Sequence, residues 1–181
     1  MKKLLKGIIW SIVVLVVVVV GGAYLLPGEA VVERHVAINA PADKVYAIIA
    51  SMKRFNEWSP WAAIDPATQY SFEGPDAGVG QKMSWTSKDQ NVGNGSQTIV
   101  EAIDNSRTVT EIDFGAMGRA RATLALASVN GGTGVTWTFR SELAGIGDRW
   151  MGLMFDRWIG ADYEKGLASL KSLAETEAAG G

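Results

Sequence analysis

The sequence predicts an α+β protein in which an antiparallel sheet is covered by one long C-terminal helix, with a membrane-spanning helix at the N-terminus. An uncharged apolar run over residues 7–26 predicts the spanning helix. Between residues 70 and 143, apolar and polar side chains alternate in short runs separated by turn sequences, which is typical of antiparallel strands. From Trp150 onward, apolar residues recur at three- and four-residue spacings, which predicts an amphipathic helix.

The apolar run is long enough to cross a bilayer, because 20 residues of α-helix rise about 30 Å. Residues 1–6 carry three lysines, whereas the first charge after the run is Glu29. This asymmetry predicts a cytoplasmic N-terminus and a C-terminal domain outside the cytoplasm, periplasmic in a bacterium. The alternative is a cleaved signal peptide, since Gly21-Gly22-Ala23 offers small residues at a cleavage site. The length and valine content of the run favour an uncleaved anchor.

The soluble part begins after a linker at residues 27–30, which contains Pro27 and Gly28. A first strand is predicted at 31–38, because apolar residues alternate along it. A helix is predicted from Pro41 onward, with a second short helix over 53–58 that ends before Pro60.

Later strands are predicted around Tyr70–Phe72, Met83–Trp85, Gln97–Ile103, Thr108–Phe114, Ala122–Leu126 and Val135–Leu143. The turns between them are predicted at Gly74-Pro75-Asp76, Asn94-Gly95, Asp104-Asn105 and Asn130-Gly131-Gly132. A single long helix is predicted from Asp148, and it should cover the apolar face of the sheet. The domain therefore spans residues 31–177, with a tail at 178–181.

Composition excludes several kinds of chemistry. There is no cysteine and one histidine, His35, so thiolate nucleophiles, Cys-ligated metals and paired imidazoles are absent. Three of the 17 basic residues precede the apolar run, which leaves 14 basic and 19 acidic residues, a net charge of about −5. No nucleic-acid partner is expected for such a domain. The sequence predicts no metal and no cofactor.

Several stretches carry a resemblance to a known family. They are Val32-Glu33-Arg34 through Ile38-Asn39-Ala40-Pro41, Trp58-Ser59-Pro60-Trp61, Phe72-Glu73-Gly74-Pro75 with Gly78-Val79-Gly80, and Tyr163-Glu164-Lys165-Gly166-Leu167. On these residues the domain resembles the START/polyketide-cyclase superfamily (SRPBCC, or helix-grip fold), and its membrane-anchored uncharacterised branch. The resemblance implies a curved sheet wrapped around the C-terminal helix, with a cavity for a hydrophobic or amphipathic molecule between them.

The candidate cavity residues are mostly aromatic side chains on the predicted apolar faces. They are Trp58, Trp61, Met83, Trp85, Phe114, Trp137, Phe139, Trp150, Met154 and Trp158. Two interpretations stay open for them, namely a cavity wall and plain core packing. Met117 lies in a glycine-bounded turn that is a candidate for part of an entrance.

Polar candidates offer little catalytic chemistry. His35 is expected to face solvent, as are Glu111 and Asp113. Arg34 shares the phase of the apolar face, so it either points inward toward a ligand head group or lies along the sheet edge. Gly78-Val79-Gly80 runs into a strand without a following Gly-Lys-Ser/Thr, so a turn is favoured over a phosphate loop. No nucleophile–base pair is visible, and no catalytic residue is predicted.

The predicted function is therefore a membrane-anchored carrier or sensor of a hydrophobic small molecule, such as a lipid or an aromatic compound. One alternative is a cyclase- or dehydratase-like enzyme that uses the same cavity. The other is an interaction module whose interior is filled by its own side chains.

Overall fold

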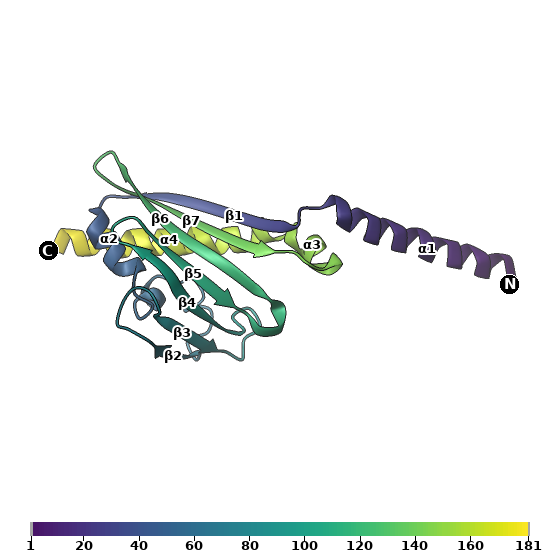
Figure 1. The fold of residues 1–181 in the computed structure, drawn as a ribbon, viewed down its shortest axis with the longest axis horizontal. Coiled ribbons are helices and arrows are strands. Elements are labelled where there is room, and N and C mark those ends of the chain that lie inside the picture. The colour runs from purple at the N-terminus through teal and green to yellow at the C-terminus, as the bar shows by residue number, and fades with distance from the viewer. Residues whose placement is uncertain (1, 181) are drawn as a thin grey trace.

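The computed structural model describes residues 2–180 as one domain with an N-terminal helix projecting from one end (Figure 1). The helices are α1 (Lys2–Leu25), α2 (Ala42–Ile49), α3 (Ile146–Gly152) and α4 (Phe155–Gly180), with 3₁₀ turns η1 (Phe55–Glu57) and η2 (Gly115–Met117). The strands are β1 (Glu29–Ile38), β2 (Gln69–Glu73), β3 (Lys82–Thr86), β4 (Asn94–Ile103), β5 (Arg107–Asp113), β6 (Arg119–Val129) and β7 (Gly132–Glu142).

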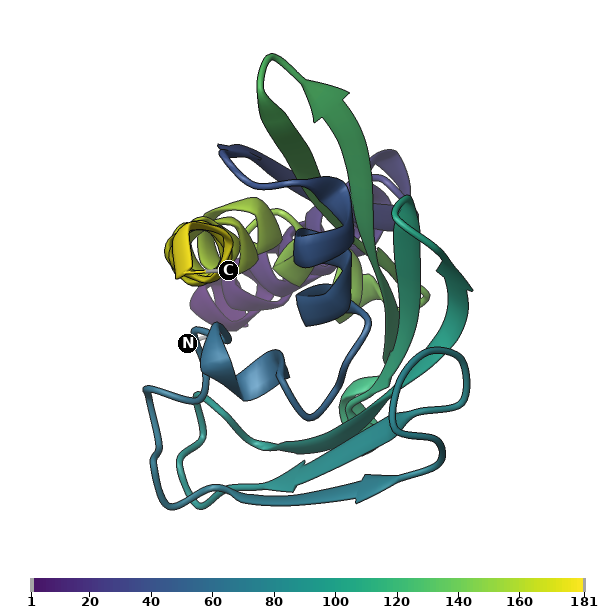
Figure 2. The same ribbon diagram turned by 90° about the vertical axis from the view of Figure 1, so that its left-hand side faces the viewer.

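The seven strands form one antiparallel sheet in the order β1-β7-β6-β5-β4-β3-β2. Strands β2 to β7 follow one another as neighbours, and β1 joins at the edge of β7. The sheet curves around α4 (Figure 2), so the predicted α+β helix-grip fold is confirmed. The register places Trp137 beside Leu124 and Arg34, which makes one continuous face toward the helix.

The core lies between this face and the helices α2 and α4. Ile48 of α2 and Leu170 of α4 have no solvent exposure, and Val135 of β7 is equally buried. A second, smaller cluster of Met52, Met83 and Ile99 lies under the β3–β4 half of the sheet. The apolar positions that alternate along the sequence therefore form the helix-facing side of the sheet.

Arg34 of β1 ties the edge of the sheet to α4. Its guanidinium donates to Glu164 Oε1 at 2.7 Å and to Asp156 Oδ1 at 2.9 Å. These two carboxylates raise the pKa of Arg34, and the Arg34 hydrogen bond lowers the pKa of Asp156. Gly160 lies against the guanidinium, where an added Cβ would overlap it. Of the two orientations left open by the sequence, Arg34 takes the sheet edge, and its partners are carboxylates of the chain itself.

Three local predictions are wrong. The long terminal helix is interrupted, because α3 ends at Gly152 and α4 begins at Phe155. Gly152, the last residue of α3, packs closely on the buried side chain of Leu143, because a Cβ added to Gly152 would lie 2.5 Å from Leu143 Cδ1. Residues 53–58 form turns and the single 3₁₀ turn η1 instead of an α-helix.

The third wrong prediction is the Asn94-Gly95 turn, because both residues belong to β4. The β3–β4 connection is made instead at residues 87–93, and Gly93 there has φ +63°. Gly95 serves packing, since an added Cβ would lie 2.5 Å from the Trp85 ring and 2.7 Å from the Asp113 carbonyl oxygen. From the sequence alone, a strand glycine that makes room for a neighbouring ring cannot be told from a glycine in a turn, which is why the turn prediction is wrong here.

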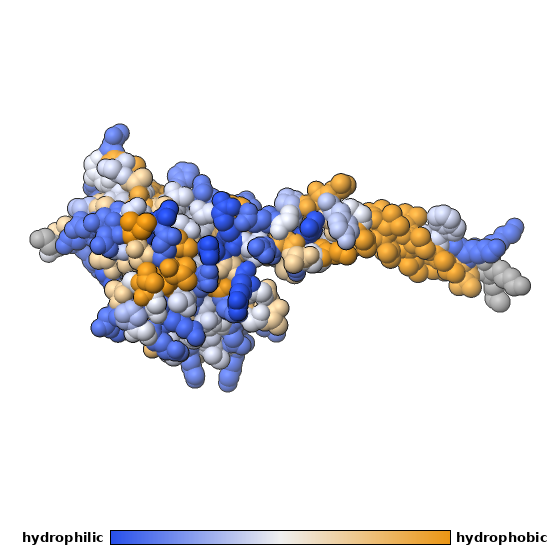
Figure 3. All heavy atoms as spheres, in the orientation of Figure 1, coloured by the Kyte–Doolittle hydropathy of each residue, from blue (hydrophilic) through white to orange (hydrophobic). Residues whose placement is uncertain are grey.

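Helix α1 is the one described helix that is long and apolar enough to cross a membrane, judged by length and composition. Its surface is continuously hydrophobic, with hydrophilic residues at its N-terminal end (Figure 3). Only its last turns touch the domain, where they meet α3. The rest of α1 is exposed, which is unlike the core helix of a soluble protein.

Candidate functional site: a groove at the α3 end of the sheet

A groove of about 760 Å³ opens at the end of the sheet where β7 ends and β6 begins. Its walls come from the start of β1, the β5–β6 connection, the end of β7, α3 and the first residue of α4. The lining residues are Glu29, Glu111, Met117, Gly118, Arg119, Ala120, Arg121, Arg140, Ser141, Glu142, Leu143, Ala144, Asp148, Met151 and Phe155. With Glu111 of β5, the groove therefore draws on six separate segments of the chain.

The inner part of the groove is apolar. Leu143 and Ala120 are buried there, and the ring of Phe155 meets Phe139 edge-on at 6.1 Å. Two methionines lie at the mouth, Met117 from η2 and Met151 from α3, and Met117 is 78% exposed. Thioether side chains adapt to ligands of different shape, so this mouth suits a variable apolar molecule.

The outer rim carries charges of both signs, and most of them are paired. Arg121 donates to Glu111 at 2.6 Å, and Arg140 donates to Glu29 at 3.2 Å. Arg119 pairs with Asp113 at 3.0 Å. The pKa of Asp113 is lowered, mainly by the backbone N–H of Gly115 and then by Arg119. A groove with charged residues at its rim and apolar residues at its floor offers polar contacts to the head group of an amphipathic ligand and apolar contacts to its hydrophobic part.

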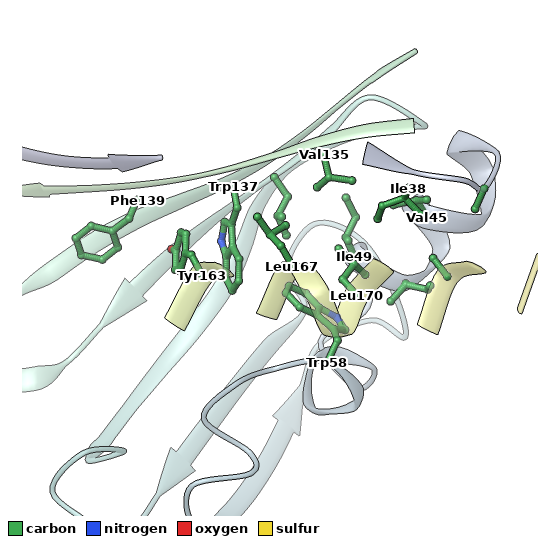
Figure 4. Packing of buried hydrophobic residues seen from close by; sticks show 14 of the residues in the cluster. Ile38, Val45, Ile49, Trp58, Val135, Trp137, Phe139, Tyr163, Leu167 and Leu170 are labelled. Atoms are coloured by element: carbon green, nitrogen blue, oxygen red, sulfur yellow. The ribbon is translucent and has the colours of Figure 1, made fainter. Parts of the chain in front are cut away.

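None of the ten residues predicted to line a cavity lies in this groove. Trp58, Trp61 and Trp137 instead pack with Tyr163 and Phe55 in one aromatic cluster (Figure 4 labels Trp58, Trp137 and Tyr163). Trp137 stacks on Tyr163 at 3.7 Å and meets Trp58 edge-on at 5.1 Å. These rings fill the middle of the space between β7 and α4.

The other predicted residues are spread over several places in the domain. Met83 belongs to the smaller core cluster, and Trp85 packs edge-on against Phe114 at 6.2 Å. Phe139 is buried behind Phe155. Met154 is half-buried in the turn before α4. Trp150 and Trp158 are predicted on the buried face of one long helix, but Trp150 of α3 is 39% exposed and Trp158 in the first turn of α4 is 52% exposed.

The buried donors that lack a partner among the described residues include Trp58 Nε1 and Gln97 Nε2. Both residues are more than nine-tenths buried. A bound water or a polar ligand atom would satisfy them. Within residues 2–180, no group of three or more His, Cys, Asp or Glu side chains is arranged to hold a metal ion.

The polar predictions agree better with the structure. His35 is exposed on the outer face of β1, and Glu111 lies on the same outer face of the sheet. The groove itself was missed by sequence reasoning, since its residues are far apart in the chain. Its one visible signal was Met117 in its glycine-bounded turn, which was a candidate for an entrance and does line the mouth.

Solved structures with the same fold are numerous. The di-domain ARO/CYC StfQ from the steffimycin biosynthetic pathway matches with TM-score 0.62 and 12% identity, over 83% of this chain and 52% of that one. The KanY protein matches with TM-score 0.61 and 18% identity, over 82% and 99%. Protein CV1439 from Chromobacterium violaceum matches with TM-score 0.57 and 19% identity, over 80% and 97%. At these identities the likeness shows the fold alone.

A search of curated protein sequences finds no significant match. A family model does match, and it covers residues 29–175, from the first residue of β1 to the last turns of α4. The model describes polyketide cyclases, dehydrases and lipid-transport proteins. With a curved sheet closed on its terminal helix and a family match over nearly the whole domain, the chain belongs to the polyketide cyclase/dehydrase and lipid-transport family.

Proposed function

We propose that this protein is a membrane-anchored binding domain that holds a hydrophobic or amphipathic small molecule, a lipid or an aromatic compound, as a carrier or sensor. The observation that carries the proposal is the groove at the α3 end of the sheet. Its volume of about 760 Å³ suits a small molecule, and its floor of Leu143, Ala120 and Phe155 is apolar. Family membership supports the same class of ligand.

We propose binding in preference to turnover because carboxyl groups around the groove are exposed and paired with arginines. A general acid or base needs a carboxyl group whose pKa is raised by burial. Here Glu111 and Glu29 are each about half exposed, and each accepts from an arginine. Asp113, close by, has a lowered pKa, which keeps it ionised. These groups are suited to orienting a polar head group.

The anchor in this proposal is α1. It spans Lys3–Leu25 with a mean hydropathy of 2.7, and the lysines precede its apolar part. We place its N-terminus in the cytoplasm and the sheet domain on the other side of the membrane. A reporter fused to the C-terminus should be active if it works only outside the cytoplasm. Activity of a cytoplasm-only reporter there would contradict this orientation, and removal of residues 1–26 from the mature protein would identify a signal peptide.

The binding test uses the full chain in lipid nanodiscs. Native mass spectrometry of gently purified protein should detect a bound small molecule, and a fluorescent fatty acid should bind after that molecule is stripped. Ala144→Trp should weaken fatty-acid binding at least tenfold, because Ala144 is an exposed residue that lines the groove. Ala127→Trp is the matched control, since Ala127 is exposed in β6 outside the groove. Equal binding by both variants, or no ligand with either method, would reject the groove as the site.

A further inference from the structure

Helix α3 is held against the last turns of α1 by Trp150. The indole Nε1 donates to the carbonyl oxygen of Val19 at 3.0 Å. Gly22 makes room for the ring, because an added Cβ there would lie 2.9 Å from the indole Cζ2. The indole therefore lies directly on the backbone of the apolar helix.

Arg149 makes the second connection. Its guanidinium donates to the carbonyl oxygens of Ala23 at 3.2 Å and Leu26 at 3.4 Å, and it lies 5.8 Å from the centre of the Tyr24 ring. It also donates to the Leu143 carbonyl oxygen at 3.3 Å. Arg149 thus satisfies carbonyls that a helix C-terminus leaves free, and it ties them to the end of β7.

These contacts fix the depth of α3 relative to α1. Val19 follows Lys6 by thirteen residues, which is about 20 Å along the helix axis. A hydrocarbon core about 30 Å thick that begins beside Lys6 therefore ends roughly 10 Å beyond Val19. The indole of Trp150 hydrogen-bonds at the level of Val19, about 10 Å inside that boundary. Interfacial helices bury their apolar face to a depth of about 5–10 Å, so α3 has the depth of such a helix when α1 spans the bilayer.

Large apolar side chains are exposed on α3, just after its end and in the first turn of α4. Five of them form what we call the α3 surface: Ile146, Trp150 and Met151 of α3, Leu153 after its end, and Trp158 of α4. Leu153 is 55% exposed. The charges between them are balanced, since Asp148 and Asp156 offset Arg149 and Arg157. Tryptophan prefers the interfacial layer of a bilayer, and the α3 surface has two.

We infer that the α3 surface lies in the interfacial layer of the bilayer that α1 spans, and that it docks the domain with the groove opening at the lipid surface. The inference rests on the proposed anchor and adds an orientation and a second membrane contact. Met151 links the two features, because it belongs to the α3 surface and also lines the groove. Since the charges balance, uncharged phosphatidylcholine suffices as the lipid partner.

The test exploits the absence of cysteine from the chain. Three single-cysteine variants of the full-length protein, Val16→Cys, Leu153→Cys and Val129→Cys, are spin-labelled in phosphatidylcholine vesicles. Val16 reports on the span, Leu153 on the α3 surface, and Val129 on the β6–β7 hairpin at the end of the domain away from α1 (Figure 1). All three side chains are exposed, so the labels should not disturb packing. The measured quantity is the collision rate with oxygen relative to that with a water-soluble nickel chelate.

We expect the nickel collision rate at position 153 to be at least fivefold lower than at position 129, with position 16 deepest. The rate at 153 should be the same in 50 mM and 500 mM salt. If position 153 is as accessible to nickel as position 129 while position 16 lies in hydrocarbon, docking is overturned and the anchor stands. If position 16 is also accessible, the anchor itself fails. If the nickel collision rate at position 153 falls only when anionic lipids are present, the contact is electrostatic, and the inference of an apolar contact is overturned.

Discussion

The ring of Tyr163 in α4 stacks on the indole of Trp137 in β7, with centroids 3.7 Å apart and planes 11° from parallel. Both side chains are buried, and Gly166, one helical turn along, lets the indole approach the helix backbone. This contact joins the terminal helix to the middle of the sheet. It also occupies part of the space between the sheet and α4, where a cavity is predicted from the resemblance.

The stacked pair predicts the cost of removing the ring. Tyr163→Ala should lower the free energy of unfolding by about 3–5 kcal/mol, because it leaves a cavity beside Trp137. Tyr163→Phe keeps the ring and should cost less than about 1.5 kcal/mol. Urea unfolding of the full chain in detergent, followed by circular dichroism, measures both. Similar losses for the two variants would show that ring packing is not the main contribution.

Burial of Tyr163 also predicts that the protein loses stability at alkaline pH. Desolvation raises the pKa of this phenol well above its ordinary value of 10.0. Above pH 10 the unfolded chain loses the proton while the folded chain keeps it, so stability falls as pH rises, by at most about 1.4 kcal/mol per pH unit. Between pH 9 and 11, Tyr163→Phe should lose less stability than the natural chain. The other tyrosines contribute equally to both proteins, so their effects cancel in this comparison. If the free energy of unfolding falls with pH by the same amount in both, the raised pKa of Tyr163 is contradicted.

We expect the ion pairs of Arg34 at the edge of the sheet to contribute to the free energy of unfolding. Arg34→Met should cost about 1–2 kcal/mol, because it removes two charge-assisted hydrogen bonds at a guanidinium that is only 24% exposed. The control is Arg121→Met, which breaks an exposed pair with Glu111 and should cost less than about 0.5 kcal/mol. In a double-mutant cycle, Arg34→Met and Glu164→Gln should be non-additive. Strict additivity would show that the pair contributes nothing.

The position of the core predicts that the domain folds without its helix. Neither core cluster contains a residue of α1. A variant that lacks residues 1–27 should stay soluble and unfold cooperatively. Amides of α3 should exchange with deuterium faster than in the full chain, because Arg149 and Trp150 lose their partners, while α4 should be unchanged. An insoluble or non-cooperative product would mean that α1 belongs to the core.

The strands and the two long helices were predictable because their apolar periods are unambiguous. The break between α3 and α4 was not, since the three- and four-residue spacing runs through Leu153, Met154 and Trp158 without interruption. At this break Gly152 packs closely on Leu143, and Trp150 of α3 hydrogen-bonds to Val19 of α1. The first contact lies outside the helical spacing and the second joins residues 131 apart, so local periodicity reports neither.

The same limit applies to the site. Core packing and a cavity wall both place Trp58 and Trp137 on apolar faces, so the sequence left the choice open. The edge-on contact between these rings is decided by where η1 lies on the sheet. The groove depends on how the ends of β1, β6 and β7 meet α3, and no segment of it carries a motif. Whether the ten predicted residues touch a ligand stays a prediction.

The connection between α1 and the sheet is very short. Helix α1 ends at Leu25 and β1 begins at Glu29, so a fully extended backbone between them spans at most about 14 Å. With α1 in a bilayer, the domain has too little reach to deliver cargo to a second membrane. Under the proposed function, the domain would therefore bind molecules in place, taking them from the adjoining leaflet or from a soluble partner that comes to it. Encounters with membrane-dissolved molecules then take place by diffusion in two dimensions, at the high local concentration that the bilayer itself provides.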